Sequence, residues 1–159
     1  MLVKNIVLAL DLSLTETGYA ICKIEKGNFE VLEFGTIKTS SKDSMGYRLQ
    51  LIESELIRIM QKWHPDSVVK EKSFSNRNIT STQAIFQVVR IASYAIWKEL
   101  ELVPIDYAAT NIKKTLTGNG RASKEHLMEK VKALTNSEPT NFDESDAIAV
   151  AYTYYLDKV

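Results

Sequence analysis

Residues 6–11 read Ile-Val-Leu-Ala-Leu-Asp, an unbroken apolar run that ends in a carboxylate. A run of this kind is typical of a strand that is buried on both faces in the middle of a sheet. Further strands are expected at residues 18–24 and 29–37, joined by a turn that contains Gly27. We therefore expect Asp11 at the carboxyl end of a central strand.

Helices and strands alternate along the rest of the sequence. Apolar residues recur at helical spacing over residues 46–63, and Pro65 follows this segment. The remaining pattern predicts an α/β fold with helices on the faces of the sheet. The further elements expected are strands at 66–70 and 102–107, helices at 80–100, 108–116 and 124–134, and a last helix capped by Asn141 with Glu144 as its capping-box partner.

The composition is that of one globular domain over residues 1–159, with 45% hydrophobic and 25% charged residues. No signal peptide or membrane-spanning run is evident, which predicts a cytoplasmic protein. Cys22, the single cysteine, is expected to be a buried and inert thiol.

The charge balance restricts how a nucleic acid could be bound. Lys+Arg and Asp+Glu both number 20, so the formal net charge is zero. A nucleic-acid partner then needs a local basic patch. Between Lys70 and Lys124, nine basic residues stand against four acidic ones, which is the expected place for such a patch.

Four acidic residues point to a metal site. Asp143 and Asp146 are three positions apart at the start of the last predicted helix, so they project the same way. Asp11 and Glu71 each end a strand, and sites in α/β sheets form at the carboxyl ends of strands. Such oxygen ligands suit Mg²⁺ or Mn²⁺. Two such ions about 4 Å apart can activate a water and stabilise the leaving oxygen of a phosphodiester.

The order and spacing of the motifs resemble the RuvC family of Holliday-junction resolvases, over nearly the whole chain. The motifs that carry the resemblance are residues 10–13 with 17–20, 48–52, 64–66, 71–74, 107–109 and 143–151. The resemblance implies a ribonuclease-H-like fold with a five-stranded mixed sheet. It also implies a homodimeric, structure-selective DNA endonuclease that cuts four-way junctions in recombination, repair or phage genome processing.

The resemblance also implies roles for individual residues. Asp11, Glu71, Asp143 and Asp146 become catalytic ligands of two Mg²⁺ ions, with Mn²⁺ as a substitute. Lys113 and Lys124 become catalytic lysines near the scissile phosphate, although the sequence alone equally allows solvated helix lysines. Phe74 is expected to stack in the opened junction. The full predicted DNA-binding set is Lys72, Phe74, Arg77, Lys113, Lys114, Arg121 and Lys124.

The sequence departs from the family pattern at two informative places. Leu12 and Ser13 stand where the family often has Pro-Gly, and Lys70 stands where an apolar residue normally precedes the glutamate. Because adjacent strand residues face opposite sides, Lys70 is not expected in the metal site. It either reaches towards DNA or favours the ionised form of Glu71. These departures favour a bacteriophage-type member.

The predicted helix at residues 80–100 is apolar on more than one face. One face can cover the sheet, and the other predicts a partner, for which a symmetric homodimer is our hypothesis. Three alternative functions stay open at this point: an actin-like ATP-binding module, a RuvC-like nuclease acting on structured RNA, and a junction-binding protein without catalysis.

Overall fold

The structure is a computed structural model that describes residues 3–73 and 78–159. The predicted DNA contacts Phe74 and Arg77 lie outside the described residues. Within the described ranges, no helix has both the length and the apolar character needed to cross a membrane.

One mixed sheet organises the chain, and its strand order is β3-β2-β1-β4-β5. The pairs β1–β2 and β2–β3 are antiparallel, whereas β1–β4 and β4–β5 are parallel. This arrangement confirms the predicted five-stranded mixed sheet with the first strand at its centre. The strands are β1 (Asn5–Asp11), β2 (Glu16–Glu25), β3 (Asn28–Lys38), β4 (Ser67–Glu71) and β5 (Ile105–Tyr107).

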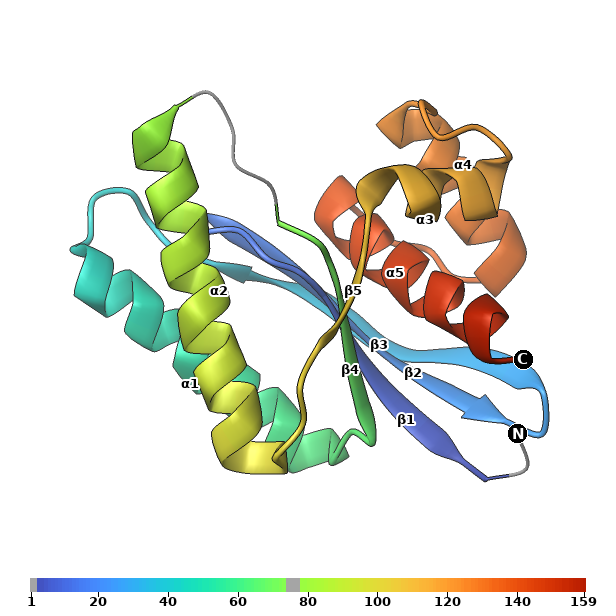
Figure 1. The fold of residues 1–159 in the computed structure, drawn as a ribbon, viewed down its shortest axis with the longest axis horizontal. Helices are drawn as coiled ribbons and strands as arrows, with labels where there is room; N and C mark the ends of the chain where they lie inside the picture. Colours follow the sequence, from blue (N-terminus) through green and yellow to red (C-terminus); the bar gives the residue numbers. More distant parts are fainter. Residues whose placement is uncertain (1–2, 74–77) are drawn as a thin grey trace.

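Helices cover both faces of this sheet, as predicted (Figure 1). On one face lie α1 (Met45–Trp63) and α2 (Ile79–Leu100). On the other face lie α3 (Ala109–Thr117), α4 (Lys124–Thr135) and α5 (Phe142–Lys158). The central strand serves both layers, because Leu8 packs towards α1 and α2 while the next residue, Ala9, packs towards α5.

The fifth strand is shorter than the sequence pattern predicts. Residues 102–107 were expected to form it, but the paired segment begins only at Ile105. The residue before it is Pro104, which has no amide hydrogen to donate to a neighbouring strand. The edge of the sheet next to β4 therefore consists of a short strand followed directly by α3.

The start of α5 is anchored by its N-cap. Asn141 Oδ1 accepts a hydrogen bond from the Glu144 amide at 2.9 Å, which confirms the predicted cap. The capping-box prediction was wrong in one respect. The Glu144 carboxylate accepts from the amide and the hydroxyl of Thr140, both at 2.8 Å, instead of from the Asn141 amide. Both arrangements satisfy backbone donors at a helix start that would otherwise be unpaired.

Candidate active site

A polar cavity of about 170 Å³ opens at the carboxyl ends of β1 and β4. Three of the four predicted acids line it, and so do both predicted catalytic lysines. Apolar residues of α3 and α4 complete its wall. The lining residues are Asp11, Glu71, Asp146, Lys113, Lys124, Ala109, Ile112 and Leu127.

The sheet register explains how the acids meet. Leu10 of β1 pairs in parallel with Lys70 of β4, so the residues that follow, Asp11 and Glu71, end neighbouring strands. Val69 packs towards α5, and side chains alternate along a strand, so Glu71 points to the same face. Asp146 belongs to α5, whose first turns pass over this end of the sheet. Three segments far apart in sequence thus place three carboxylates around one cavity.

These carboxylates are poorly compensated by the protein itself. Burial, followed by the charges of Asp146, Glu71 and Asp143, raises the pKa of Asp11 from 3.8 to about 8. Burial also raises the pKa values of Glu71 and Asp146, and for Glu71 the charge of Asp146 adds to the effect. Carboxylates that share a site without enough positive charge disfavour one another's ionisation. The cavity therefore has a deficit of positive charge.

Lys124 provides part of the missing charge. Its Nζ lies 3.1 Å from Asp146 Oδ2, and its side chain is 58% exposed. Burial alone would lower the pKa of Lys124, but Asp146, Asp11 and Glu71 together raise it above the ordinary value. The charge of Lys113 likewise opposes the rise in the pKa values of Glu71 and Asp146. The two lysines thus act on the acids from α3 and α4.

Asp143 is placed differently from the other three acids, because it does not line the cavity. Its pKa is raised to about 6, first by burial, then by a hydrogen bond and charge from Glu16, and then by Asp146. Glu16, which begins β2, was not among the predicted site residues. The signal that could have revealed it is the antiparallel pairing of β1 with β2, which brings the start of β2 beside the end of β1.

The other predicted DNA contacts are spread over the surface. Lys72, Lys114 and Arg121 are exposed and do not line the cavity. Lys70 is buried, and its Nζ forms an ion pair with Asp106 Oδ1 of β5 at 2.8 Å. Both expectations for Lys70, a reach towards DNA and support of ionised Glu71, were therefore wrong. Register pairing sets Lys70 directly opposite Asp106 on the neighbouring strand.

The donor set of the cavity fits a hard divalent cation, because its ligand atoms are carboxylate oxygens without thiol or imidazole. Among residues 3–73 and 78–159, no three His, Cys, Asp or Glu side chains are already gathered closely enough to hold an ion. The ammonium of Lys124 is bonded to one of the acids instead. Binding of a cation here would require the acids to converge and the Lys124–Asp146 contact to change.

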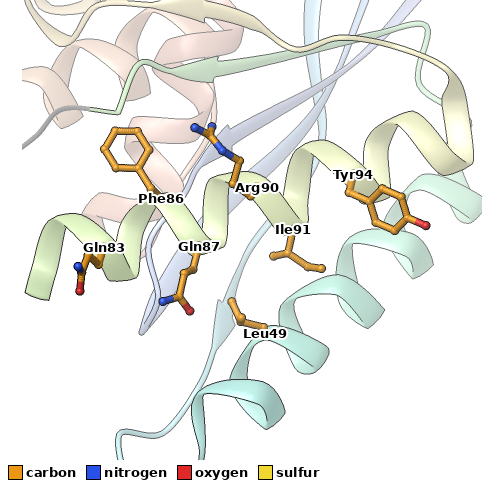
Figure 2. A pocket seen from close by; sticks show the side chains of 7 residues that line it. All are labelled: Leu49, Gln83, Phe86, Gln87, Arg90, Ile91 and Tyr94. Carbon is orange, nitrogen blue, oxygen red and sulfur yellow. The ribbon is translucent and has the colours of Figure 1, made fainter.

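A second and larger hollow, of about 790 Å³, lies on the opposite side of the sheet along α1 and α2. Figure 2 shows Ile91 of α2 pointing towards Leu49 of α1, with Tyr94 one turn further along α2. Tyr94 and Trp97 are exposed large apolar side chains of this helix. The predicted second apolar face of the helix is therefore present, while its homodimer partner stays a prediction. The hollow is lined by Leu49, Gln83, Phe86, Gln87, Arg90, Ile91 and Tyr94.

Comparison with solved structures supports the fold. The chain superposes on the Thermus thermophilus RuvC structure in complex with a Holliday junction substrate with a TM-score of 0.88 and 20% sequence identity, covering 97% of this chain and 94% of that one. For the fowlpox virus Holliday junction resolvase the TM-score is 0.61 at 13% identity, covering 96% and 99% of the two chains. These similarities show the same arrangement of sheet and helices.

Comparison of sequences identifies the family. The family model of the crossover junction endodeoxyribonuclease RuvC matches residues 7–154. The Rickettsia bellii crossover junction endodeoxyribonuclease RuvC is 35% identical over 156 residues, which cover 96% of this chain and 98% of the relative. The Rickettsia rickettsii protein of the same name is 33% identical over the same coverage. By motif order, fold and full-length similarity, this chain belongs to the RuvC family.

Proposed function

We propose that this chain is a resolvase, a structure-selective DNA endonuclease that cuts four-way Holliday junctions by metal-dependent hydrolysis of phosphodiesters. The observation that carries the proposal is the cavity in which Asp11, Glu71 and Asp146 meet Lys113 and Lys124. Its relatives of this family are named crossover junction endodeoxyribonucleases. Buried acids with too little positive charge nearby destabilise a fold, but in a metal-dependent nuclease they provide the binding site for the cations.

Nucleases of the RuvC family generally use divalent metal ions. In this chain we assign the ligand role to Asp11, Glu71 and Asp146, with Asp143 joining from the next turn towards the start of α5. We propose Mg²⁺ as the ion, two per site, with Mn²⁺ as a substitute. When bound, such ions supply an activated water and neutralise the charge that develops on the cleaved phosphate.

The lysines bind and orient the substrate. Lys113 and Lys124 line the cavity beside the acids, so a phosphate that enters it meets two positive charges. Lys124, now bonded to Asp146 at 3.1 Å, would be free to contact the phosphate if the charge of that acid were neutralised by a bound cation. Outside the cavity, the exposed residues Lys72, Lys114 and Arg121 hold the DNA backbone without reading bases.

A four-way junction presents two symmetric strands for cutting, so two sites must act together. We propose a homodimer in which the exposed apolar face of α2 forms the contact, because Tyr94 and Trp97 are exposed there beside a large hollow. Localisation in the cytoplasm of a bacterial cell or a phage-infected host is part of the same proposal. The bacteriophage origin suggested by Leu12, Ser13 and Lys70 stays a prediction.

Cleavage of labelled substrates tests the function directly. Four-way DNA junctions, replication forks, plain duplexes and a folded RNA are incubated with the protein in Mg²⁺, in Mn²⁺ and in EDTA. We expect symmetric cuts in the four-way junction with either metal and none in EDTA. Preferred cleavage of the folded RNA would instead identify a ribonuclease, and cutting in EDTA would overturn the metal mechanism. Binding without cutting in any metal would identify a non-catalytic junction-binding protein.

A further inference from the structure

Three neighbouring strands each place one residue of a cross-strand row beneath the start of α5. Asp11 of β1 pairs with Gly18 of β2, and Gly18 pairs in turn with Thr36 of β3. Directly paired residues of antiparallel strands face the same side of the sheet. On this line, Asp11 belongs to the candidate active site, whereas Gly18 and Thr36 have no role in the proposed chemistry. Their contacts explain how the first turn of α5 is seated.

Gly18 allows the backbone of α5 to approach the sheet closely. It is buried, and its φ is not in the left-handed region, where the described glycines are Gly27 and Gly118. The need for glycine is therefore one of space. A Cβ at this position would collide with the carbonyl oxygen and carbon of Asp143 and would lie 3.1 Å from its Cα. Because the obstacle is backbone, no side-chain rotation can relieve the collision.

Thr36 holds the same turn from the other side. Asn141, the N-cap of α5, donates a hydrogen bond from Nδ2 to Thr36 Oγ1 at 3.2 Å. The other atom of the same amide, Oδ1, accepts from the Glu144 amide at 2.9 Å. One side chain thus links the first turn of the helix to β3, two strands away from Asp11.

We propose that Gly18 and the Asn141–Thr36 hydrogen bond form a seat that sets the position of the first turn of α5, and with it the placement of Asp143 and Asp146 relative to Asp11 and Glu71. Gly18 fixes how closely the helix approaches the sheet, and Thr36 fixes where along β3 it is held. Both are positioning residues, since neither lines the cavity of the candidate active site. Their effect on catalysis rests on the proposed nuclease function.

This proposal predicts that substitutions in the seat affect metal binding and turnover but not junction binding. A methyl group on Gly18 must push Asp143 away from β2, which moves two of the four acids relative to the two on the strands. A displacement of about 1 Å at a catalytic group can lower the rate by about 100-fold. The exposed lysines that hold DNA stand on other segments, such as Lys114 on α3 and Lys72 after β4. Metal binding and turnover should therefore suffer while junction binding does not.

The test compares three variants with the wild type. Gly18→Ala tests the close approach, and Thr36→Val removes the hydrogen-bond acceptor while keeping the shape of the side chain. Gly46→Ala is the matched control, because a Cβ there meets no atom within 4 Å. For each protein we measure kcat on a saturating four-way junction, junction Kd in EDTA, Mn²⁺ affinity by electron paramagnetic resonance, and thermal unfolding by circular dichroism.

For Gly18→Ala we expect kcat to fall by about 100-fold and Mn²⁺ affinity by about tenfold, with junction Kd within twofold of the wild type. Thr36→Val should lower kcat and Mn²⁺ affinity by about threefold to fivefold, as for the loss of one hydrogen bond. Gly46→Ala should match the wild type in kcat, junction Kd and Mn²⁺ affinity.

A folded Gly18→Ala protein with wild-type Mn²⁺ affinity would overturn the proposal that Gly18 positions the first turn of α5. If Gly18→Ala is unfolded at the assay temperature, Thr36→Val decides, and wild-type Mn²⁺ affinity in that variant overturns the proposal. If the wild type binds Mn²⁺ but cuts no junction, the proposed function fails, while the Mn²⁺ affinities of the variants still decide the positioning role. The two proposals can thus fail separately.

Discussion

Lys70 and Glu71 are neighbours at the end of β4, yet Lys70 has a partner of opposite charge whereas Glu71 lies among other acids. Lys70 faces the side of α1 and α2, where it is buried and paired with Asp106 at 2.8 Å. Glu71 faces the side of α5, where burial and the charge of Asp146 raise its pKa. A charge with a dedicated partner is part of the architecture, whereas a cluster of like charges without enough partners indicates a site for a ligand.

The same contrast extends to the two layers as a whole. The α1 and α2 side is filled by large aliphatic side chains such as Leu8, Leu10 and Leu56. On the α5 side, Ala9 and Ala20 in the sheet face a helix rich in alanine, and Gly18 meets the backbone of Asp143. Small residues let the helix approach closely, so its acids reach the ends of the strands. The α1 and α2 layer mainly buries apolar surface of the sheet, whereas the α5 layer also places acidic side chains at the ends of β1 and β4.

The largest expected effect comes from neutralising an acid on the α5 side. Asp146→Asn should lower junction cutting by more than about 1,000-fold, because it removes a proposed metal ligand whose charge acts on Asp11, Glu71 and Lys124. Junction binding in EDTA should stay within about threefold, since phosphate contacts do not depend on this acid. Single-turnover cleavage and a gel-shift titration measure the two quantities.

Glu129→Gln is the matched control for Asp146→Asn, because Glu129 is an exposed acid of α4. It should cut like the wild type. Full activity of Asp146→Asn would show that this acid is not needed for cutting. The proposal that the α5 side of the sheet carries the catalytic acids would then fail.

Loss of the internal countercharge should have the next largest effect. Lys124→Met removes the ammonium that opposes the raised pKa values of Asp11, Glu71 and Asp146. We expect cutting to fall by about 10- to 100-fold and the pH dependence of Mn²⁺ binding to move to higher pH. Lys130→Met, an exposed lysine of α4, should change neither. An unshifted pH profile in Lys124→Met would show that Lys124 does not influence the acids.

On the other side of the sheet, the Lys70–Asp106 pair should affect stability without altering chemistry. Asp106→Asn leaves the buried ammonium without its charged partner and should lower the free energy of unfolding by about 1–3 kcal/mol, less than for a fully buried pair because Asp106 is half exposed. Lys70→Met replaces the ammonium with an apolar side chain and should be close to neutral. Urea unfolding measures both. Both folded variants should cut junctions like the wild type, and reduced cutting by Lys70→Met would contradict a purely structural role.

The last effect concerns stability and not cutting, and it is a pH-dependent gain in stability when Asp11 is neutralised. Folding raises the pKa of Asp11 from 3.8 to about 8, mainly through burial. Between these values the folded protein keeps a proton that the unfolded chain has lost, so stability falls as pH rises through this range. Asp11→Asn escapes that loss.

In EDTA, the Tm of Asp11→Asn should therefore match the wild type near pH 4 and exceed it by about 10 °C or more at pH 8. Mn²⁺ added at pH 8 should raise the Tm of the wild type more than that of the variant. A Tm difference that is the same at both pH values would show that Asp11 is not held in a charge-poor site.

Much of the fold could be predicted because its signals are local. The apolar run at residues 6–11 identified the central strand, and Asn141 identified the start of the last helix. The fifth strand was predicted too long, because the pattern of apolar residues carries no information about the missing amide hydrogen of Pro104. Of the predicted site residues, the cavity brings together Asp11, Glu71, Asp146, Lys113 and Lys124.

The sequence by itself thus determined which residues end strands, which cap helices and which carry charge, because these properties depend on neighbours within a few positions. Only the tertiary structure decided that Glu16 lies beside Asp143, that Lys70 pairs with Asp106, and that Gly18 lies directly against the backbone of Asp143. Each of these contacts joins segments that are far apart along the chain. Their existence depends on strand register and on how closely a helix packs, and neither quantity is encoded in any single stretch of sequence.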